Sequence, residues 1–222
     1  MGLKEFATVS DNTTIDNPRH LNKKLKKLKR EQRYLSRKVK GSQNRKKQIT
    51  KVQTVYRKVR NSRSYFHHKT SSSMIAKYSG VVLEDLNIKG IMKNSKLARS
   101  VSDIGWYEFN RQLEYKAKWN SKHFVKIDRF FASSKICNEC GNKKVDLTLK
   151  DRMYVCKNCG NTLDRDFNAS KNIRDEGIRI LNIKNTGGQS GINACGDGKI
   201  AESPCDSVAV FETGKVLTKI IS

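Results

Sequence analysis

Two C-x-x-C pairs constrain the fold of this chain more than any other feature of its sequence. Cys137 and Cys140 form the first pair, and Cys156 and Cys159 form the second after fifteen intervening residues. Thiolates at this spacing can close a tetrahedral shell around one zinc ion, which leaves no coordination position for a catalytic water. The spacing therefore predicts a structural zinc ribbon, in which the intervening residues form a short hairpin.

The alternative is that the four thiols pair as two disulfides. The N-terminal residues MGLKEFATVSD contain no apolar signal-peptide core, and no apolar run approaches the ~20 residues that cross a bilayer. These features predict a cytoplasmic protein, and a reducing compartment favours metal binding over disulfides. Gly141 and Gly160, which follow the second cysteine of each pair, suit the tight turns of a metal site. Cys195 and Cys205 lie outside this module and are predicted to be free thiols.

The second constraint is an excess of positive charge. The chain has 46 Lys and Arg residues against 21 Asp and Glu residues, which gives a formal net charge of +25. Positions 19–69 hold twenty of the basic residues and a single acid, Glu31. Apolar residues recur at helical spacing on both sides of Gly41 and Ser42, which predicts two basic amphipathic helices that form a hairpin.

Helices with solvated charged faces are the ordinary explanation of such a run. The near absence of acids instead favours an anionic partner, because cations on both helices repel one another. A nucleic acid is the partner that this charge predicts, since each neutralised phosphate releases condensed counterions. The candidate contacts are Lys23, Lys24, Lys26, Lys27, Arg30, Arg33, Arg37, Lys38, Arg45, Lys46 and Lys47.

The rest of the chain alternates between short strand and helix patterns. Residues 6–9, 81–83 and 124–132 predict strands, and residues 109–120 predict an amphipathic helix. Glu84 ends the second of these strands, and taken alone it is an ordinary strand-end carboxylate that faces water. Four aromatic side chains are either core residues or platforms for stacked bases, and helical spacing favours the core: Trp106, Tyr107, Tyr115 and Trp119.

Two aspartates follow the cysteine module almost at once, in the stretch DRDFNASKNI. An aspartate at the start of a helix commonly caps it, which is one interpretation of Asp164. The other interpretation is that Asp166 binds Mg²⁺ while the helix from Phe167 holds it rigidly. Spacing alone does not separate the two.

The segments VLEDLNIKGI, SSKICNECG with CKNCG, and DRDFNASKNI occur in this order, and together they resemble the TnpB family of transposon-encoded, RNA-guided DNA nucleases. The resemblance covers Gly2 to about Asn172. It implies an α/β fold with an RNase H-like (RuvC-like) core and a zinc ribbon inserted before the third of three acids. By this resemblance Glu84 is the second acid and Asp166 the third, Mg²⁺ is the catalytic metal, and DNA and a guide RNA are the partners, with no membrane association.

The match departs from the family at its start. The family's first acid directly precedes a hydrophobic residue and a glycine, and Met1 and Gly2 occupy those positions here. We therefore expect an N-terminally truncated member with weak or no DNA cleavage, because two Mg²⁺ ions about 3.5–4 Å apart need bridging negative charge. Asp11 lies too far along the chain to replace the first acid. A nuclease-dead regulator that binds DNA or RNA is the alternative.

This interpretation divides the chain into a core with two insertions, followed by a tail. The Gly-rich part of the tail is expected to be flexible, with a strand or short helix within 208–221. The expected boundaries are 1–18, 73–133 and 164–184 for the core, 19–72 for the basic helical hairpin, 134–163 for the zinc ribbon and 185–222 for the tail.

Overall fold

A five-stranded mixed sheet lies at the centre of the computed structural model, which describes residues 5–148, 151–186 and 208–212. The strand order is β2-β1-β7-β3-β4. The strand β3 runs parallel to both β4 and β7, whereas β1 runs antiparallel to its neighbours β2 and β7. The strands are β1 (Glu5–Val9), β2 (Thr14–Asp16), β3 (Gly80–Glu84), β4 (His123–Ile127) and β7 (Val208–Glu212).

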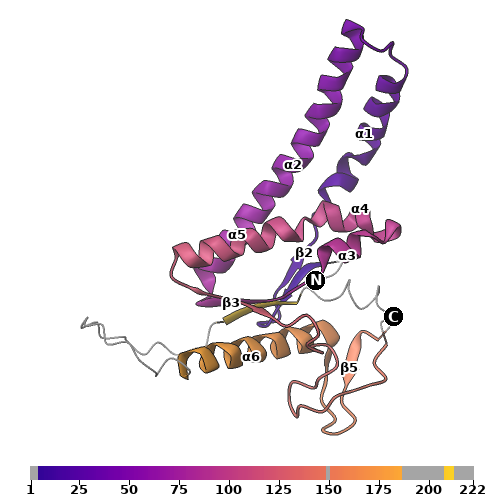
Figure 1. Cartoon of the computed structure of the whole chain (residues 1–222). Coiled ribbons are helices and arrows are strands. Elements are labelled where there is room, and N and C mark those ends of the chain that lie inside the picture. Colours follow the sequence, from indigo (N-terminus) through magenta and orange to yellow (C-terminus); the bar gives the residue numbers. More distant parts are fainter. Residues whose placement is uncertain (1–4, 149–150, 187–207, 213–222) are drawn as a thin grey trace, which may run out of the picture.

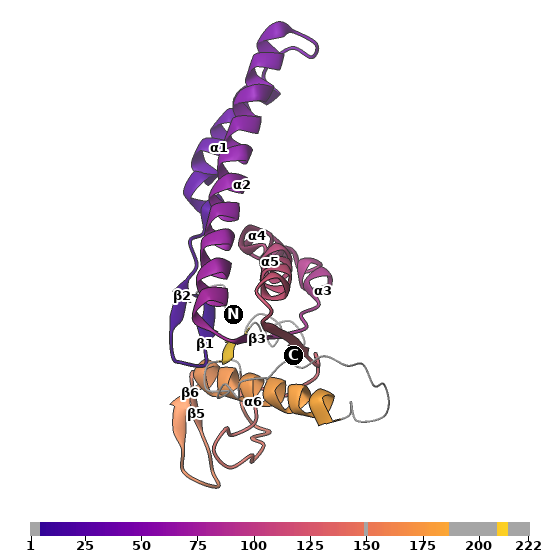
Figure 2. The same ribbon diagram turned by 90° about the vertical axis from the view of Figure 1, so that its left-hand side faces the viewer.

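Helices cover both faces of this sheet. Successive side chains of a strand point to opposite faces, so β3, which is buried along its whole length, contributes to two cores. Val81 and Leu83 pack in a cluster with residues of α5 (Trp106–Trp119), whereas Val82 packs against Ile173 of α6 (Arg165–Thr186). Figures 1 and 2 show α5 and α6 on opposite sides of the sheet.

The larger core is aromatic at its centre. The ring of Phe6 meets those of Phe66 and Phe109 edge-on, with centroids 4.9 and 4.8 Å apart. Trp106 is fully buried beside them, which agrees with its expected core role. The short helices α3 (Ile88–Met92) and α4 (Ser95–Ile104) add apolar residues to the same cluster.

The other expected core aromatics lie at the surface. Tyr107 and Trp119 are 72% and 77% exposed, so the prediction that helical spacing buries them is wrong for these two residues. Tyr115 is half-buried, and its ring contacts that of Trp119. The physical reason is that α5 presents only one side to the sheet.

The two predicted basic helices are present as α1 (His20–Ser36) and α2 (Gln43–Lys77), which form a hairpin that projects from the sheet (Figure 1). Their contact surface is apolar, and Leu28 packs there against Val52 and Val55. The single acid of this region is buried in the same seam, where the Gln48 amide donates to a Glu31 carboxylate oxygen at 2.9 Å.

Side chains from other elements satisfy both ends of α1. At its start Arg19 offers no side-chain cap, and the Leu21 N–H instead donates to both oxygens of Asp103 in α4, at 2.9 and 3.0 Å. At its end, the Arg45 guanidinium donates to the carbonyls of Leu35 and Lys38. Unpaired backbone groups at helix ends are costly, so these contacts fix where α1 begins and ends.

The cysteine module lies beside α6, below the sheet in the view of Figure 1. Its hairpin is formed by β5 (Met153–Val155) and β6 (Thr162–Asp164), which flank the second cysteine pair. The prediction that the hairpin lies between the two pairs is therefore wrong, because each C-x-x-C turn itself reverses the chain. A single bridge between Ile136 and Lys143 flanks the first pair in the same way.

Two further expectations concern the ends of the molecule. In the 208–221 stretch, the described residues form strand β7, which confirms the strand rather than the helix alternative. Cys195 and Cys205 lie outside the described residues.

Among the helices that the structure describes, none is both long enough and apolar enough to span a bilayer.

Candidate metal centres and nucleic-acid interface

The four predicted zinc ligands converge on one point. The sulfurs of Cys137 and Cys159 are 3.7 Å apart, those of Cys140 and Cys156 are 3.6 Å apart, and all four lie within 4.8 Å of one another. All four thiols are free. Disulfide sulfurs would be ~2 Å apart. A tetrahedral ion with Zn–S bonds of about 2.3 Å separates its sulfurs by about 3.8 Å, which the observed distances fit.

Two equivalent backbone turns present these thiols. In each turn the N–H of the first cysteine donates to a carbonyl five residues on, and its carbonyl accepts from the glycine four residues on. Both glycines, Gly141 and Gly160, have positive φ angles of 73° and 71°, as expected for these turns. The sequence therefore dictates the pocket locally, and the hairpin brings its two halves together.

The electrostatics of the thiols favour a bound cation. The backbone N–H of Cys159 donates to Cys156 and lowers the pKa of Cys156 to about 6. The Asn161 amide alone would lower the pKa of Cys159, but the neighbouring thiols raise it to about 12. Four thiolates this close repel one another, so a cation is needed to hold all of them in the ionised form.

Glu84 lies at the end of β3 and is buried, with 9% of its surface exposed. The expectation of an ordinary carboxylate facing water is therefore wrong. The segment after β4 folds over it, and the Ser133 hydroxyl donates to Glu84 Oε1 at 2.6 Å. This hydrogen bond orients the carboxylate without neutralising its charge.

The two aspartates after the cysteine module have different environments. Asp164 is exposed, and its Oδ1 accepts from the N–H groups of Asp166 and Phe167 at 2.8 and 3.2 Å, so it caps α6. Asp166, in the first turn, is only 3% exposed, and its Oδ1 lies 3.9 Å from Arg165 Nε. The capping interpretation of Asp164 is confirmed, and Asp166 is the buried carboxylate of the pair.

Glu84 and Asp166 lie toward the same end of the packed pair β3 and α6. Gly177 allows α6 to lie directly on β3, because a Cβ there would clash with Val82. One turn and a half nearer the start of α6, Asn172 contacts Ser133, the residue that binds Glu84. The C-terminal end of β3, which carries Glu84, therefore lies toward the N-terminal end of α6, which carries Asp166. Carboxylate oxygens are the ligands that Mg²⁺ prefers, so the donor set fits that ion.

Two asparagines tie the cysteine module to the same helix. The Asn172 amide donates to the carbonyls of both Ser133 and Ile136 at 2.7 Å. One turn earlier, Asn168 donates to Ile136 and accepts from the N–H of Asn138. Residues 133–138 are thus fixed to α6 on both sides of Cys137.

The sequence prediction missed Ser133, Asn168 and Asn172. A signal was available for the asparagines, because residues four apart share one face of a helix and asparagine is a poor helix former. Nothing in the sequence pattern pointed to Ser133.

Two other acids that could complete a metal site are already engaged. Asp11 accepts from Lys77 and from the Tyr78 hydroxyl, both at 2.6 Å. Although burial opposes it, these hydrogen bonds hold the pKa of Asp11 well below its usual range. Asp85 is half exposed and forms an ion pair with Arg129 at 2.6 Å.

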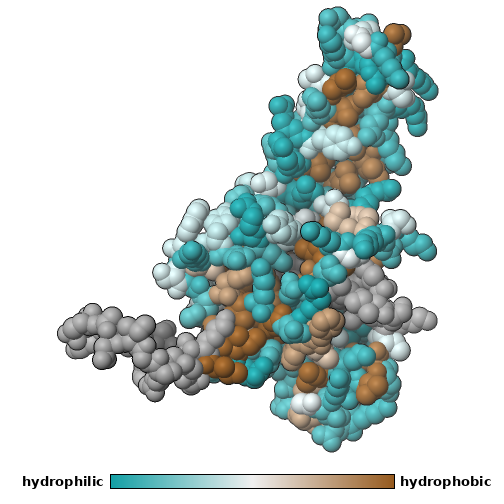
Figure 3. All heavy atoms as spheres, in the orientation of Figure 1, coloured by the Kyte–Doolittle hydropathy of each residue, from teal (hydrophilic) through white to brown (hydrophobic). Residues whose placement is uncertain are grey.

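The predicted nucleic-acid contacts are distributed over the outer faces of the hairpin. Ten of the eleven are exposed; Arg45 is half-buried, since it caps α1. Figure 3 shows hydrophilic side chains along both edges of the hairpin and a hydrophobic stripe along its seam. The structure therefore leaves most of these cations accessible to a polyanion.

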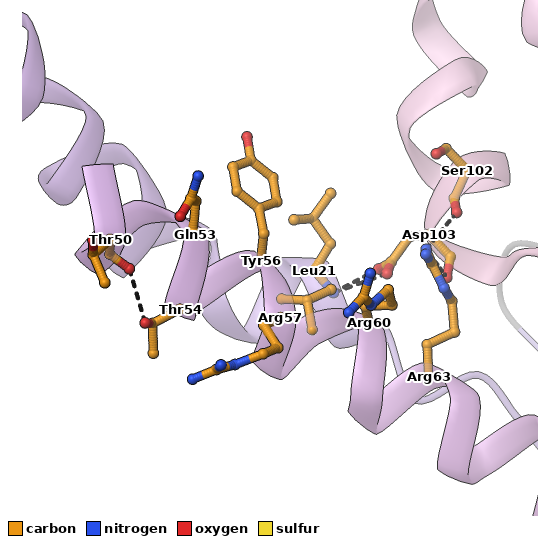
Figure 4. A pocket seen from close by; sticks show the side chains of 11 residues that line it. Leu21, Thr50, Gln53, Thr54, Tyr56, Arg57, Arg60, Arg63, Ser102 and Asp103 are labelled. Carbon is orange, nitrogen blue, oxygen red and sulfur yellow. Dashed lines mark hydrogen bonds between the residues drawn. The ribbon is translucent and has the colours of Figure 1, made fainter. Parts of the chain in front are cut away.

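A hollow of about 650 Å³ lies where the hairpin meets α4 (Figure 4). Arg57, Arg60 and Arg63 line it from α2, and Arg63 donates to the Ser102 carbonyl at 2.8 Å. The prediction did not include these arginines, although their spacing of three places them along one side of a helix. They extend the basic surface from the hairpin to its base.

Known proteins match two stretches of the chain. Residues 1–95 match the OrfB_IS605 family model, described as "Probable transposase", and residues 106–173 match the Cas12f1-like TNB domain. A "Putative RNA-guided DNA endonuclease" of Streptomyces pristinaespiralis is 40% identical over 197 residues, which cover 89% of this chain and 46% of the relative. The "Putative RNA-guided DNA endonuclease InsQ" of Escherichia coli (strain K12) is 33% identical over 195 residues, 81% of this chain and 48% of the relative.

The chain thus spans about half the length of the curated relatives it matches. Among solved structures, it is similar to a chain in the cryo-EM structure of the Cas12f1-sgRNA-target DNA complex. The TM-score is 0.51 at 18% identity, and the match covers 72% of this chain and 43% of that chain. This likeness supports a shared mixed α/β fold.

Proposed function

The chain belongs to the TnpB-like family of RNA-guided DNA endonucleases, and we propose that it binds a guide RNA and DNA and uses Glu84 and Asp166 to hold Mg²⁺ for phosphodiester hydrolysis. One observation carries this proposal: two buried carboxylates, from β3 and α6, lie toward one end of the same strand–helix pair. Buried carboxylates are rare unless they are paired or coordinate a metal.

Each part of the site has a distinct task in this proposal. Bound Mg²⁺ supplies a Lewis acid that polarises a phosphoryl oxygen and activates a coordinated water. Glu84 provides one carboxylate, oriented by the Ser133 hydroxyl. Asp166 provides another from the first turn of α6, where the positive end of the helix dipole favours negative charge. Two carboxylates hold such an ion weakly, so we expect weak cleavage from this pair alone.

We propose that the sheet with α5 and α6 is a RuvC-like core and that the four-cysteine module is a zinc ribbon inserted into it. The sulfur spacing and the all-thiolate donor set support zinc. The hydrogen bonds from Asn168 and Asn172 would hold this ribbon beside the catalytic acids.

A second function, nucleic-acid binding without cleavage, is favoured by the hairpin. Its exposed cations lie on α1 and α2, which project away from the side of the sheet that α6 covers (Figure 2). Binding through these cations would not require the two carboxylates. The chain would then act by occupying its target.

A cleavage assay distinguishes the two functions. The full chain is incubated with Mg²⁺, RNA transcribed from its own locus and a matching DNA duplex, beside Glu84→Gln and Asp166→Asn. We expect weak Mg²⁺-dependent cleavage that both variants lose while they still bind DNA. Salt-sensitive binding without cleavage would establish the second function. Equal cleavage by all three proteins would refute the assignment of the acids.

A further inference from the structure

Two adjacent phenylalanines follow strand β4, and their environments are opposite. Phe131 packs into the core between β3 and α6, beside Val82 and Ile173. The side chain of Phe130 is 88% exposed, more than any other large apolar side chain that the structure describes. Single exposed apolar residues are common on protein surfaces, so exposure alone assigns no role to Phe130. Its position in the fold does.

Hydrogen bonds fix the turn that exposes Phe130. The Phe130 N–H donates to Asp128 Oδ1 at 2.7 Å, and the Phe131 N–H donates to the Asp128 carbonyl at 3.2 Å. The Ser133 N–H then donates to the Phe131 carbonyl at 2.8 Å. The backbone that carries the exposed ring is therefore ordered before any ligand arrives, which lowers the entropic cost of binding.

Two side chains tie this turn to the end of β3. The Arg129 guanidinium donates to the carbonyl and to the carboxylate of Asp85, at 3.1 and 2.6 Å. The Ser133 hydroxyl donates to Glu84. Phe130 lies between these two tethers, and three residues of chain span at most about 11 Å. The backbone of Phe130 is therefore within about 11 Å of the residue that orients Glu84.

A substrate strand at the proposed metal site would pass close to this ring. Stacked nucleotides rise ~3.4 Å each, so Phe130 lies within about three nucleotides of a phosphate held near Glu84. Aromatic side chains stack on bases of any sequence, because every base has a π-face. A contact that tolerates any sequence suits a family in which pairing with a guide RNA selects the target.

We propose that Phe130 is a stacking platform for an unpaired base of the DNA strand that reaches Glu84 and Asp166. The inference rests on the proposed function of these acids and adds a substrate contact to it. One base stacked on a ring held by an ordered turn would fix the position of the strand, so that a neighbouring phosphate meets the bound metal ion.

Photocrosslinking tests the contact directly. The full chain is irradiated with a single-stranded deoxyoligonucleotide that carries 5-iodouracil at staggered positions, and mass spectrometry locates the crosslinked residue. We expect a crosslink at Phe130. Trp119, an exposed ring on the opposite side of the sheet from α6, is the internal reference. A crosslink at Trp119 without one at Phe130 would overturn the inference. So would a crosslink at Phe130 that forms only with the RNA version of the oligonucleotide.

Substitutions test what the contact does. Phe130→Ala should raise KM for DNA cleavage by about 10-fold and leave kcat within about 3-fold, because stacking binds ground state and transition state alike. Phe130→Trp keeps an aromatic face and should stay within about 3-fold of the parent. Trp119→Ala is the control and should change neither constant. A fall in kcat with KM unchanged would contradict a role in binding the strand.

Thermal unfolding separates a ligand contact from a structural residue. Phe130→Ala should preserve Tm because the ring is exposed, whereas Phe131→Ala should lower Tm because it leaves a cavity in the core. Equal losses of Tm from the two variants would make Phe130 a structural residue. If Phe130→Ala instead converts a dimer to monomers in sedimentation, the ring contacts a second copy of the chain and not a base.

Mn²⁺ binding distinguishes failure of this inference from failure of the proposed function, because Mn²⁺ takes the same oxygen ligands as Mg²⁺. Glu84→Gln should weaken Mn²⁺ binding by at least about 10-fold, and Phe130→Ala should leave it unchanged. If Glu84→Gln has this effect but no DNA crosslinks to Phe130, the metal site stands and the stacking platform is refuted. If Glu84→Gln has no effect, the proposed metal site is refuted, and with it the role of Phe130 beside that site.

Discussion

The hydroxyl of Ser133 donates to Glu84 at 2.6 Å while the carbonyl of the same serine accepts from Asn172. One residue therefore connects the acid at the end of β3 to the helix that carries Asp166. Because residues 133–138 also lead into the cysteine module, the orientation of Glu84 depends on how that module sits on α6.

We expect Ser133→Ala to weaken Mn²⁺ binding by about 10-fold, because the hydrogen bond from the Ser133 hydroxyl orients the Glu84 carboxylate. Ser133→Thr keeps the hydroxyl and should recover most of the loss. The measurement is a Mn²⁺ titration of each purified protein. Ser134→Ala is the matched control, and an equal effect from both alanine variants would show that the loss is not due to the hydrogen bond to Glu84.

Substitutions of Asp164 and Asp166 should have different effects, the first on stability and the second on Mn²⁺ binding. Asp164→Ala removes the N-cap and should cost about 1 kcal/mol of unfolding free energy, whereas Asp164→Ser keeps a capping oxygen and should cost less. Neither should change Mn²⁺ affinity. Asp166→Asn should weaken Mn²⁺ binding by at least about 10-fold. Equal losses of Mn²⁺ binding from Asp164→Ala and Asp166→Asn would contradict the distinction drawn between cap and ligand.

The four-cysteine site should contain one zinc ion per chain in metal analysis of the native protein. Cys156→Ser should release this ion and unfold residues around β5 and β6, because a small metal module has too little core to fold without its ion. Hydrogen exchange would localise the change. Cys195→Ser is the control, since it should leave the zinc content unchanged.

Nucleic-acid affinity should fall steeply as salt rises. Neutralising five exposed hairpin residues to Gln (Lys23, Lys24, Lys26, Lys27 and Lys46) should flatten the slope of log K against log salt by about 4–5 units. Five exposed lysines outside the hairpin form the control set: Lys89, Lys93, Lys96, Lys118 and Lys143. If the control set changes the slope and the hairpin set does not, the binding surface lies elsewhere.

Stability should depend on pH through a buried histidine. Burial lowers the pKa of His67 from 6.5 to about 4, and its Nε2 lies 2.8 Å from the Ile104 carbonyl oxygen. Between these values the unfolded chain binds more protons, so unfolding free energy should fall by up to about 3 kcal/mol as pH drops from 6.5 to 4. Urea unfolding across this range should show a smaller pH dependence for His67→Gln. The exposed neighbour variant His68→Gln should behave like the parent.

Local patterns predicted much of this molecule. The sequence predicted the cysteine site, the basic helices and the strand that ends at Glu84. Each of these depends on periodicity or on turn geometry within a short window. The burial of Glu84 could not be predicted from a local pattern, because it depends on Ser133, which is 49 residues away in sequence. Tyr107 and Trp119 were misjudged because helical spacing shows that residues share a face, but not which face meets the sheet.

Strand β7 is a second feature that a local sequence pattern could not predict. Five residues, VAVFE, predict a strand or a helix with similar weight, and only the sheet decides between them. Its position beside Glu84 follows from pairing with residues more than 120 positions earlier in the chain, which no local pattern encodes.

The position of β7 also has a consequence for the order of synthesis. A ribosome produces β1, β2, β3 and β4 long before it reaches Val208, yet in the described sheet β1 and β3 meet only through β7. Until then, the nascent chain carries two incomplete half-sheets with unpaired edges, a state prone to mispairing. Completion of the sheet therefore waits for residues 208–212, and the acids at its edge reach their final geometry only after β7 has been made.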